Sequence, residues 1–402
     1  MNLTNPFYKK TVTYKYGDKT LSFRVSQNLF SSQNVDHDTQ RLLRTLLYEK
    51  VDSYKKALDL GCGYGPIGVA LKATCPAAEV HMTDRDALAI EYSKENAELN
   101  KVGQVKTYGS LGYDNIPDKN FDLIVSNIPA KVGEPILRHM IKDAQDHLVE
   151  NGRVVIVVID AIVDFIDREL TADENIKILF KRSWSGHHVY HYSFNSKGSE
   201  RSSLDQTAFN AGEFYRQKNE FNYENQNYQL VASHNLPEFD QLSYDTQLLL
   251  SNLRKIKGGL DEILCFNPGQ GYIPLALIQE FSPQHISLVD RDLLALKTAH
   301  HNLIKNGFPE NNIDIKHQVG LEIPKKVKAV IGVVPEKQNL KVYQMVIDQI
   351  SSELKQNAYV LLSSSSAVIT RLQDLLSKTK TFQTLLRDKK RGRSVLLIRK
   401  IS

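Results

Sequence analysis

Residues 58–65, Leu-Asp-Leu-Gly-Cys-Gly-Tyr-Gly, decide the fold of the first half of the chain. The short apolar segment 56–60 predicts a strand, and the apolar run from Ile67 to Ala73 predicts the start of a helix. Three closely spaced glycines between a strand and a helix permit unusual dihedral angles and let the backbone pass close to a ligand. The segment therefore predicts a ligand-binding loop. A dinucleotide fingerprint and an ordinary tight turn are the alternatives.

Strand and helix signals continue to alternate after this loop. Strands separated by helices predict βαβ units and an α/β fold with a doubly wound parallel sheet, covered on both faces. Such a sheet binds its ligand outside the carboxyl ends of its strands. The expected strands are 79–83, 105–108, 121–126, 153–158 and 188–194, and the expected helices are 87–100 and 135–148.

The second half of the chain repeats the first. The matches keep register over most of the chain, with a single one-residue shift, so a duplication explains them. The matching pairs include Asp38-Thr-Gln40 with Asp245-Thr-Gln247, Gly63-Tyr-Gly65 with Gly269-Gln-Gly271, Asp84-Arg-Asp86 with Asp290-Arg-Asp292, Asn96 with Asn302, and Asn100 with Asn306.

The duplication predicts two tandem doubly wound, Rossmann-like domains. We expect the first domain at residues 1–194 and the second at residues 228–402. Residues 195–227 are rich in Ser, Asn, Gln, Glu and Lys and are expected to form a linker or surface segment.

The composition is that of a soluble globular protein, with 41% hydrophobic and 24% charged residues. No apolar run is long enough to span a bilayer and no apolar signal region opens the chain, so we expect a cytoplasmic protein without membrane contact. The three cysteines have no metal-ligand spacing, so no metal is expected. The net charge of +5 favours a polyanionic partner only mildly. The oligomeric state does not follow from the sequence, which is compatible with a monomer.

Asp84 ends the second expected strand, about 20 residues after the glycine loop. A carboxylate at this place accepts hydrogen bonds from both ribose hydroxyls of an adenosine and repels a 2′-phosphate. Because Asp84 also precedes a helix, capping that helix is a second role, compatible with the first.

The loop resembles the first motif of class I S-adenosylmethionine-dependent methyltransferases, in which an acid lies two residues before the first glycine. The resemblance implies S-adenosyl-L-methionine as the cofactor, with the loop facing its methionine part. It also implies that Ser110 and Leu111 stand where the family often has an acid that contacts adenine. The expected cofactor-binding residues are Asp59, Gly61, Gly63, Gly65, Asp84, Ser110, Leu111 and Asn127.

The sequence Ser-Asn-Ile-Pro-Ala at residues 126–130 resembles the Asn-Pro-Pro-aromatic motif of methyltransferases that act on planar amino groups. The Asn127 side-chain oxygen and the Ile128 carbonyl can each accept an N–H bond from such a nitrogen and aim it at the methyl group. The expected catalytic residues are thus Asn127, Ile128 and Pro129. A strand-ending turn, for which Asn and Pro are common, is the alternative.

Two positions depart from that motif. Ile128 replaces its first proline, and Ala130 replaces the aromatic residue that normally stacks on a flat substrate. Losing one stacked ring costs roughly 1–3 kcal/mol if the substrate is a base. Four other aromatic residues could take its place: Tyr64, Tyr113, Trp184 and Phe30.

Residues 29–39 resemble the Phe-Ser…Asp-x-Gly-Thr/Ser segment of the "methyltransferase small" domain. Together with the loop, this resembles the ribosomal RNA guanine-N2 methyltransferases, which also carry two tandem copies. The resemblance implies that Phe30 and Asp38 lie over the cofactor pocket. The substrate-binding residues expected on these grounds are Phe30, Asp38, Ala130, Lys131 and Trp184.

The second copy has lost the residues that carry the chemistry. Cys265 stands in the place of Asp59 and Asn267 in that of Gly61, while Val333 replaces the amide of Asn127. We therefore predict that only the first copy is catalytic. In the well-known bacterial members of the family the order is reversed.

Basic turns at residues 181–188 and 387–393 could hold RNA phosphates, although a solvated hairpin is the alternative. The expected partner is ribosomal RNA or a ribosomal subunit, methylated on an exocyclic amino group. Three other functions stay open: a protein glutamine-N5 methyltransferase, a small-molecule methyltransferase and a non-catalytic cofactor-binding scaffold.

Overall fold

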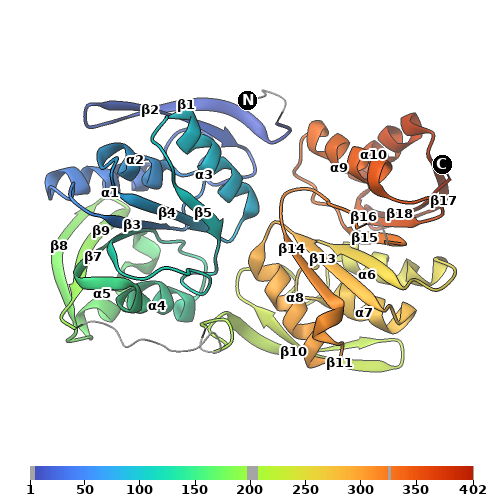
Figure 1. Cartoon of the computed structure of the whole chain (residues 1–402). Coiled ribbons are helices and arrows are strands. Elements are labelled where there is room, and N and C mark those ends of the chain that lie inside the picture. Colours follow the sequence, from blue (N-terminus) through green and yellow to red (C-terminus); the bar gives the residue numbers. More distant parts are fainter. Residues whose placement is uncertain (1–4, 197–206, 325–326, 402) are drawn as a thin grey trace. The chain divides into compact units, whose positions relative to one another are not determined.

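The computed structural model describes residues 5–196, 207–324 and 327–401. The chain divides into two compact units between Phe214 and Tyr215, and residues 5–7 belong to the second unit. Figure 1 shows that each unit is an α/β fold built around its own sheet. Within the described residues no helix is long and apolar enough to cross a membrane.

The first unit contains a seven-stranded sheet in the order β5-β4-β3-β6-β7-β9-β8 and a separate β1-β2 hairpin. Its elements are β1 (Tyr8–Tyr16), β2 (Lys19–Ser26), α1 (His37–Tyr48), β3 (Lys56–Leu60), α2 (Pro66–Thr74), β4 (Glu79–Asp84), α3 (Ala87–Leu99), β5 (Lys106–Gly109), β6 (Phe121–Asn127), α4 (Glu134–Lys142), η1 (Asp143–His147), β7 (Leu148–Ile159), α5 (Asp160–Thr171), β8 (Ile176–Trp184) and β9 (His187–Phe194).

The second unit repeats this plan, with sheet order β14-β13-β12-β15-β16-β18-β17 and a β10-β11 hairpin. Its elements are β10 (Tyr215–Tyr223), β11 (Gln226–Ser233), α6 (Tyr244–Asn252), η3 (Leu253–Lys255), β12 (Glu262–Phe266), α7 (Tyr272–Phe281), β13 (His285–Asp290), α8 (Leu293–Lys305), η4 (Glu310–Asn312), β14 (Ile313–His317), β15 (Ala329–Val333), α9 (Leu340–Glu353), β16 (Tyr359–Ser365), α10 (Ser366–Thr379), β17 (Phe382–Lys390) and β18 (Arg393–Lys400).

The two tandem α/β domains expected from the sequence are confirmed, but the sheets are mixed rather than parallel. The strands β5-β4-β3-β6-β7 run parallel, and β9 and β8 then pair antiparallel. A hairpin can turn back within a few residues, whereas a parallel strand needs a crossover helix. The short turn between Trp184 and His187 therefore forces the antiparallel edge.

Part of the segment 195–227, which was expected to be a linker or surface segment, forms regular structure. Residues 215–223 form β10 and residues 226–227 begin β11, so the hairpin belongs to the second fold. The N–H groups of Ala208 and Phe209 donate to the Asp114 carboxylate of the first unit, at 2.7 and 2.9 Å. Residues 197–206 lie outside the described part of the chain. A polar composition alone does not distinguish a linker from a surface hairpin.

The repeated asparagines of the sequence dock each hairpin onto a helix. In the first unit the Asn96 side chain accepts a bond from Arg24 N at 2.7 Å and donates to Arg24 O at 3.0 Å and Tyr64 O at 2.8 Å. Asn302 makes the same three bonds in the second unit, to Val231 and to the carbonyl of Gln270. Both asparagines are fully buried, so no water can replace their amides.

We expect Asn96→Ala to destabilise the first unit by about 2–4 kcal/mol, because it removes a fully buried amide that serves three backbone groups. The lone tryptophan, Trp184, lies in the first unit, so its fluorescence during chemical denaturation reports that unit. Asn100→Ala is the matched control. Asn100 bonds Ser22 in the same way but is partly exposed, so water replaces the lost amide and the cost is about 1 kcal/mol. Equal losses in the two variants would contradict this account.

Candidate functional site

The glycine loop joins β3 to α2 at the carboxyl edge of the first sheet. Gly61, Gly63 and Gly65 have φ angles of 76°, 54° and 87°, in the left-handed region that favours glycine. The N–H groups of Gly61 and Cys62 both donate to Thr83 O, at 2.8 and 2.9 Å, and so attach the loop to the end of β4.

The three glycines serve different purposes. A Cβ added at Gly65 would lie 3.0 Å from Ser93, so this glycine allows α2 and α3 to pack closely. A Cβ at Gly61 or Gly63 would meet no atom within 4 Å among the described residues. The first two glycines therefore border open space at the edge of the sheet where ligands bind.

Asp84 ends β4 beside this loop. One carboxylate oxygen accepts a bond from Gly63 N and the other from Asp86 N, both at 2.9 Å. Each oxygen keeps acceptor capacity for a further donor. Burial raises the pKa of Asp84 to about 6. The helix-capping role falls to Asp86, whose side chain accepts from Leu88 N at 3.0 Å.

Asp59 lies underneath the loop and is fully buried. Its Oδ2 accepts a bond from Gly68 N at 2.7 Å, which supports the first turn of α2. Burial raises its pKa to about 7. The structure therefore shows Asp59 holding the loop and helix together, which is a supporting role for the cofactor site.

Ser110 and Leu111 follow β5 at the same edge and are buried. Ser110 N donates to Asp84 O at 3.0 Å, and Ser110 Oγ donates to Gly112 O at 2.7 Å. The Ser110-Leu111 turn thus begins beside the end of β4. The Ser110 hydroxyl is engaged with its own turn and does not take the place of an acid.

Asn127 ends β6, and its amide has a defined orientation. The Nδ2 nitrogen donates to Asp36 Oδ1 and to Thr39 Oγ1, both at 3.3 Å. A carboxylate only accepts hydrogen bonds, so the amide must turn its nitrogen toward Asp36. Its oxygen is then directed away from Asp36. Next to it, Ile128 N donates to Val157 O at 3.0 Å and anchors the following peptide to β7.

Asp36 is a residue that the sequence analysis did not assign to the site. It is the N-cap of α1, where it accepts from Thr39 N at 2.9 Å and from Thr39 Oγ1 at 2.7 Å. The second unit keeps a cap at the matching place, Ser243, but has lost the amide that Asp36 orients. The N-cap pattern preceding α1 could have located Asp36, but only the fold brings it to Asn127.

The expected substrate residues have different surroundings. Phe30 is 73% exposed, Pro129 and Lys131 are also exposed, and Ala130 is partly buried. Asp38 pairs with His187, and burial raises its pKa. In the second unit Asp245 and Arg393 form the matching pair at 3.0 Å, so this contact does not depend on a catalytic asparagine.

The aromatic residue missing at position 130 has fewer replacements than the sequence suggested. Tyr64 and Tyr113 are only 2% and 4% exposed, so neither ring offers a face to a substrate. Phe30 and Trp184 remain. The Trp184 ring lies under the guanidinium of Arg182, at 4.9 Å, and near that of Arg41, at 5.7 Å.

Arg182 also lies 5.7 Å from the ring of Tyr48, which is 62% exposed. A surface cluster of rings and guanidinium groups, termed the Arg-aromatic cluster below, is thus formed by Tyr48, Arg182, Trp184 and Arg41. Such groups stack on bases and attract phosphates.

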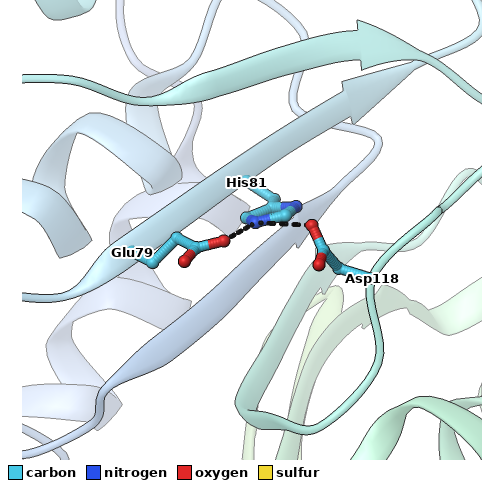
Figure 2. Close-up of side chains that lie close together, drawn as sticks. All are labelled: Glu79, His81 and Asp118. Carbon is cyan, nitrogen blue, oxygen red and sulfur yellow. Dashed lines mark hydrogen bonds and ion pairs between the residues drawn. The ribbon is translucent and has the colours of Figure 1, made fainter.

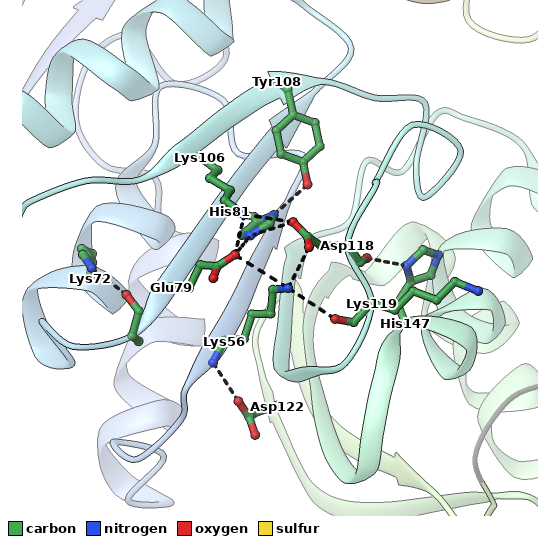
Figure 3. A network of polar contacts seen from close by, with 11 residues as sticks. Lys56, Lys72, Glu79, His81, Lys106, Tyr108, Asp118, Lys119, Asp122 and His147 are labelled. Carbon is green, nitrogen blue, oxygen red and sulfur yellow. Dashed lines mark hydrogen bonds and ion pairs between the residues drawn. The ribbon is translucent and has the colours of Figure 1, made fainter. Parts of the chain in front are cut away.

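Figure 2 shows a group with metal-ligand geometry, Glu79, His81 and Asp118. Figure 3 shows that two lysines already neutralise it: Lys106 lies 2.7 Å from Glu79 and 3.1 Å from Asp118, and Lys56 lies 3.0 Å from Asp118. Glu79 begins β4, so the group lies at the amino edge of the sheet, away from the glycine loop. We interpret it as an ion-pair network that joins the starts of three strands.

The family model of the methyltransferase small domain matches residues 20–166 and again 227–384. The chain belongs to the methyltransferase small domain family. The resemblance seen in the motifs is therefore confirmed, and the family's domain occurs in both units.

Curated proteins similar to this chain include the uncharacterized protein YbxB of Bacillus subtilis, which is 31% identical over 151 residues, 37% of this chain and 74% of that protein. Ribosomal RNA small subunit methyltransferase C of Haemophilus influenzae is 34% identical over 150 residues, 36% of this chain and 44% of that protein. The chain thus spans less than half the length of that methyltransferase.

A solved structure shares the two-unit methyltransferase fold. The Thermus thermophilus 16S rRNA N2 G1207 methyltransferase (RsmC), in complex with AdoMet and guanosine, has a TM-score of 0.64 and 16% identity. The alignment covers 99% of this chain and 100% of that one. This likeness supports the tandem methyltransferase-like fold of the whole chain.

We expect the buried Asp59 of this methyltransferase fold to make the first unit less stable as the pH rises. Its pKa is raised from the ordinary value of 3.8 to about 7, so the folded state holds a proton that the unfolded state has already released. Stability is thus lost between about pH 4 and pH 7. Asp59→Asn keeps an oxygen for Gly68 N but does not titrate.

Relative to Asp59→Asn, the wild type should lose about 2–3 kcal/mol of unfolding free energy between pH 5 and pH 8. Trp184 fluorescence during denaturation at the two pH values measures this difference. If the unfolding free energies of the wild type and Asp59→Asn changed equally between the two pH values, the Asp59 carboxyl would titrate normally in the folded state.

Proposed function

We propose that the first unit is an S-adenosyl-L-methionine-dependent methyltransferase that methylates an exocyclic amino group, guanine N2, of ribosomal RNA. The observation that carries the proposal is the Asn127 amide, whose nitrogen is held by Asp36 and Thr39 while its oxygen is left for a substrate N–H. Asp36 and Asn127 occur together in the first unit, and both are replaced in the second, by Ser243 and Val333.

The residues around the loop fit the proposed cofactor. Gly61 and Gly63 border open space for the methionine part, and the Asp84 carboxylate has acceptor capacity left for ribose hydroxyls. When bound, S-adenosyl-L-methionine supplies a methyl group that its sulfonium already activates. The protein therefore contributes mainly position and desolvation.

The amino group of a guanine is planar and weakly nucleophilic, because its lone pair is delocalised into the ring. Asn127 Oδ1 and the Ile128 carbonyl accept its two N–H bonds and favour the pyramidal form that attacks the methyl carbon. Two fixed acceptors are sufficient for this step, and a strong general base is not required.

Ribosomal RNA is the substrate class that the surface of the first unit favours. The Arg-aromatic cluster offers stacking faces and positive charge, and the chain carries a net charge of +5. Two of the similar proteins reported above, the Haemophilus influenzae and Thermus thermophilus methyltransferases, are named for small-subunit or 16S ribosomal RNA. A base held in a helix must be flipped out to reach Asn127. Such a substrate also fits the cytoplasmic location expected from the sequence.

We expect Asp84→Ala to abolish cofactor binding, Asn127→Ala to abolish transfer while sparing binding, and Asp290→Ala to do neither. Titration calorimetry with S-adenosyl-L-methionine measures binding. Transfer is measured as tritiated methyl incorporated into ribosomal subunits, bulk RNA and protein extract. Label in protein alone would favour a glutamine amide as the substrate, and absence of binding would overturn the proposal. If Asp290→Ala lowered binding as much as Asp84→Ala, or transfer as much as Asn127→Ala, the proposal of a single active unit would be contradicted.

We expect Asp36→Ala to lower kcat by about 10- to 100-fold and to leave cofactor affinity unchanged. The remaining partner, the Thr39 hydroxyl, can donate as well as accept, so it does not fix the Asn127 oxygen toward the substrate. Thr39→Ser keeps the hydroxyl that holds the amide and is the matched control, with near-normal kcat. Equal activity of Asp36→Ala and the wild type would show that Asn127 needs no orienting partner.

A further inference from the structure

A solvent-open pocket lies in the second unit, at the carboxyl edge of its sheet. Asn267 follows β12, Asp290 ends β13, Gln318 follows β14 and Val334 follows β15, and all four line the pocket. These are the second unit's counterparts of the elements that form the candidate cofactor site in the first. The pocket therefore lies where a ligand of a doubly wound sheet is expected.

The side of this pocket around Asp290 resembles the region around Asp84 that is proposed to bind ribose in the first unit. Asp290 corresponds to Asp84, and its Oδ1 accepts a bond from Asp292 N at 2.9 Å. Gln318 N donates to Asp290 O at 3.1 Å, as Ser110 N does to Asp84 O at 3.0 Å. The carboxylate that would accept ribose hydroxyls is thus kept in the same backbone frame and lines the pocket.

The side of the pocket around Asn267 is obstructed. It corresponds to the region around Gly61 that is proposed to face the methionine part of the cofactor in the first unit. Asn267 replaces Gly61, and its Nδ2 donates to Val333 O at 2.8 Å. Val333 ends β15 at the place of Asn127, so this amide bridges the gap between the loop and the neighbouring strand. In the first unit the same space is open, because a Cβ at Gly61 would meet no described atom within 4 Å. A long chain on the ribose 5′ carbon would meet the Asn267 side chain.

The remaining wall combines apolar surface with a single unsatisfied acceptor. The apolar surface of the pocket includes the side chains of Phe7, Val319, Leu321 and Val346. The Oε1 atom of Gln338 is buried, and among the described residues it has no hydrogen-bond donor. A buried acceptor without a partner is unfavourable, and turning the partly exposed Gln338 side chain toward the pocket would let a ligand N–H satisfy it.

We propose that this pocket binds a purine nucleoside of the adenosine type, with ribose hydroxyls on Asp290 and the exocyclic amino group on Gln338, and that it excludes S-adenosyl-L-methionine. The apolar walls take the flat base, while Asn267 limits the ligand to one without a methionine chain. This inference goes beyond the proposed methyl transfer and does not require the first unit to be active.

Titration calorimetry of adenosine into the full chain tests the proposal with two matched variants. We expect Asp84→Asn, which disables the candidate cofactor site of the first unit, to retain one adenosine site. Asp290→Asn should lose that site and keep its affinity for S-adenosyl-L-methionine. No adenosine binding to Asp84→Asn at millimolar concentration would overturn the proposal, whether or not S-adenosyl-L-methionine binds to the wild type.

Inosine and Gln338→Leu test the contact to the base. Inosine has an oxygen in place of the amino group of adenosine, so it should bind to the Asp84→Asn protein about 10-fold more weakly. Gln338 lies in the connection between β15 and α9, outside both elements. Gln338→Leu should therefore leave the fold intact and weaken the binding of adenosine by a similar factor. If Gln338→Leu in the Asp84→Asn background left the affinity for adenosine unchanged, the assignment of Gln338 would be overturned.

Discussion

The geometry of the site depends on a sharp turn between β3 and α2 at the carboxyl edge of the first sheet. Gly61, Gly63 and Gly65 allow this turn because their φ angles are positive. Asp59 supports it from below, Thr83 O receives two of its N–H groups, and Asp84 receives a third. The loop, the end of β4 and the end of β6 therefore surround one space, and the proposed cofactor and amino group would meet there.

The duplication separates what the fold needs from what the chemistry needs. Contacts present in both units, such as the hairpin bonds of Asn96 and Asn302, are structural. Contacts present in the first unit alone, above all that of Asp36 with Asn127, belong to the proposed reaction. In the second unit a side chain extends across the gap that Gly61 leaves open, so the pocket there suits a shorter ligand.

The sequence was a good guide to elements with strong local patterns. The strands near 56–60 and 121–126 and the helix near 87–100 occur within a residue of their expected bounds. The hairpins β1-β2 and β10-β11 were missed because β1 and β10 are mostly polar, and a two-stranded ribbon depends on packing against the rest of its unit. Ion-pair networks such as that of Glu79 with Lys106 were equally invisible, since they join separate strands.

The sequence alone determined the duplication, the α/β class and the methyltransferase family, because each depends on residue identity and spacing. Only the tertiary structure decided that Asp36 orients Asn127, that Asp59 supports the loop, and that Tyr64 and Tyr113 are too buried to stack on a substrate. Orientation, burial and pKa depend on neighbours that are remote along the chain and are brought together by folding.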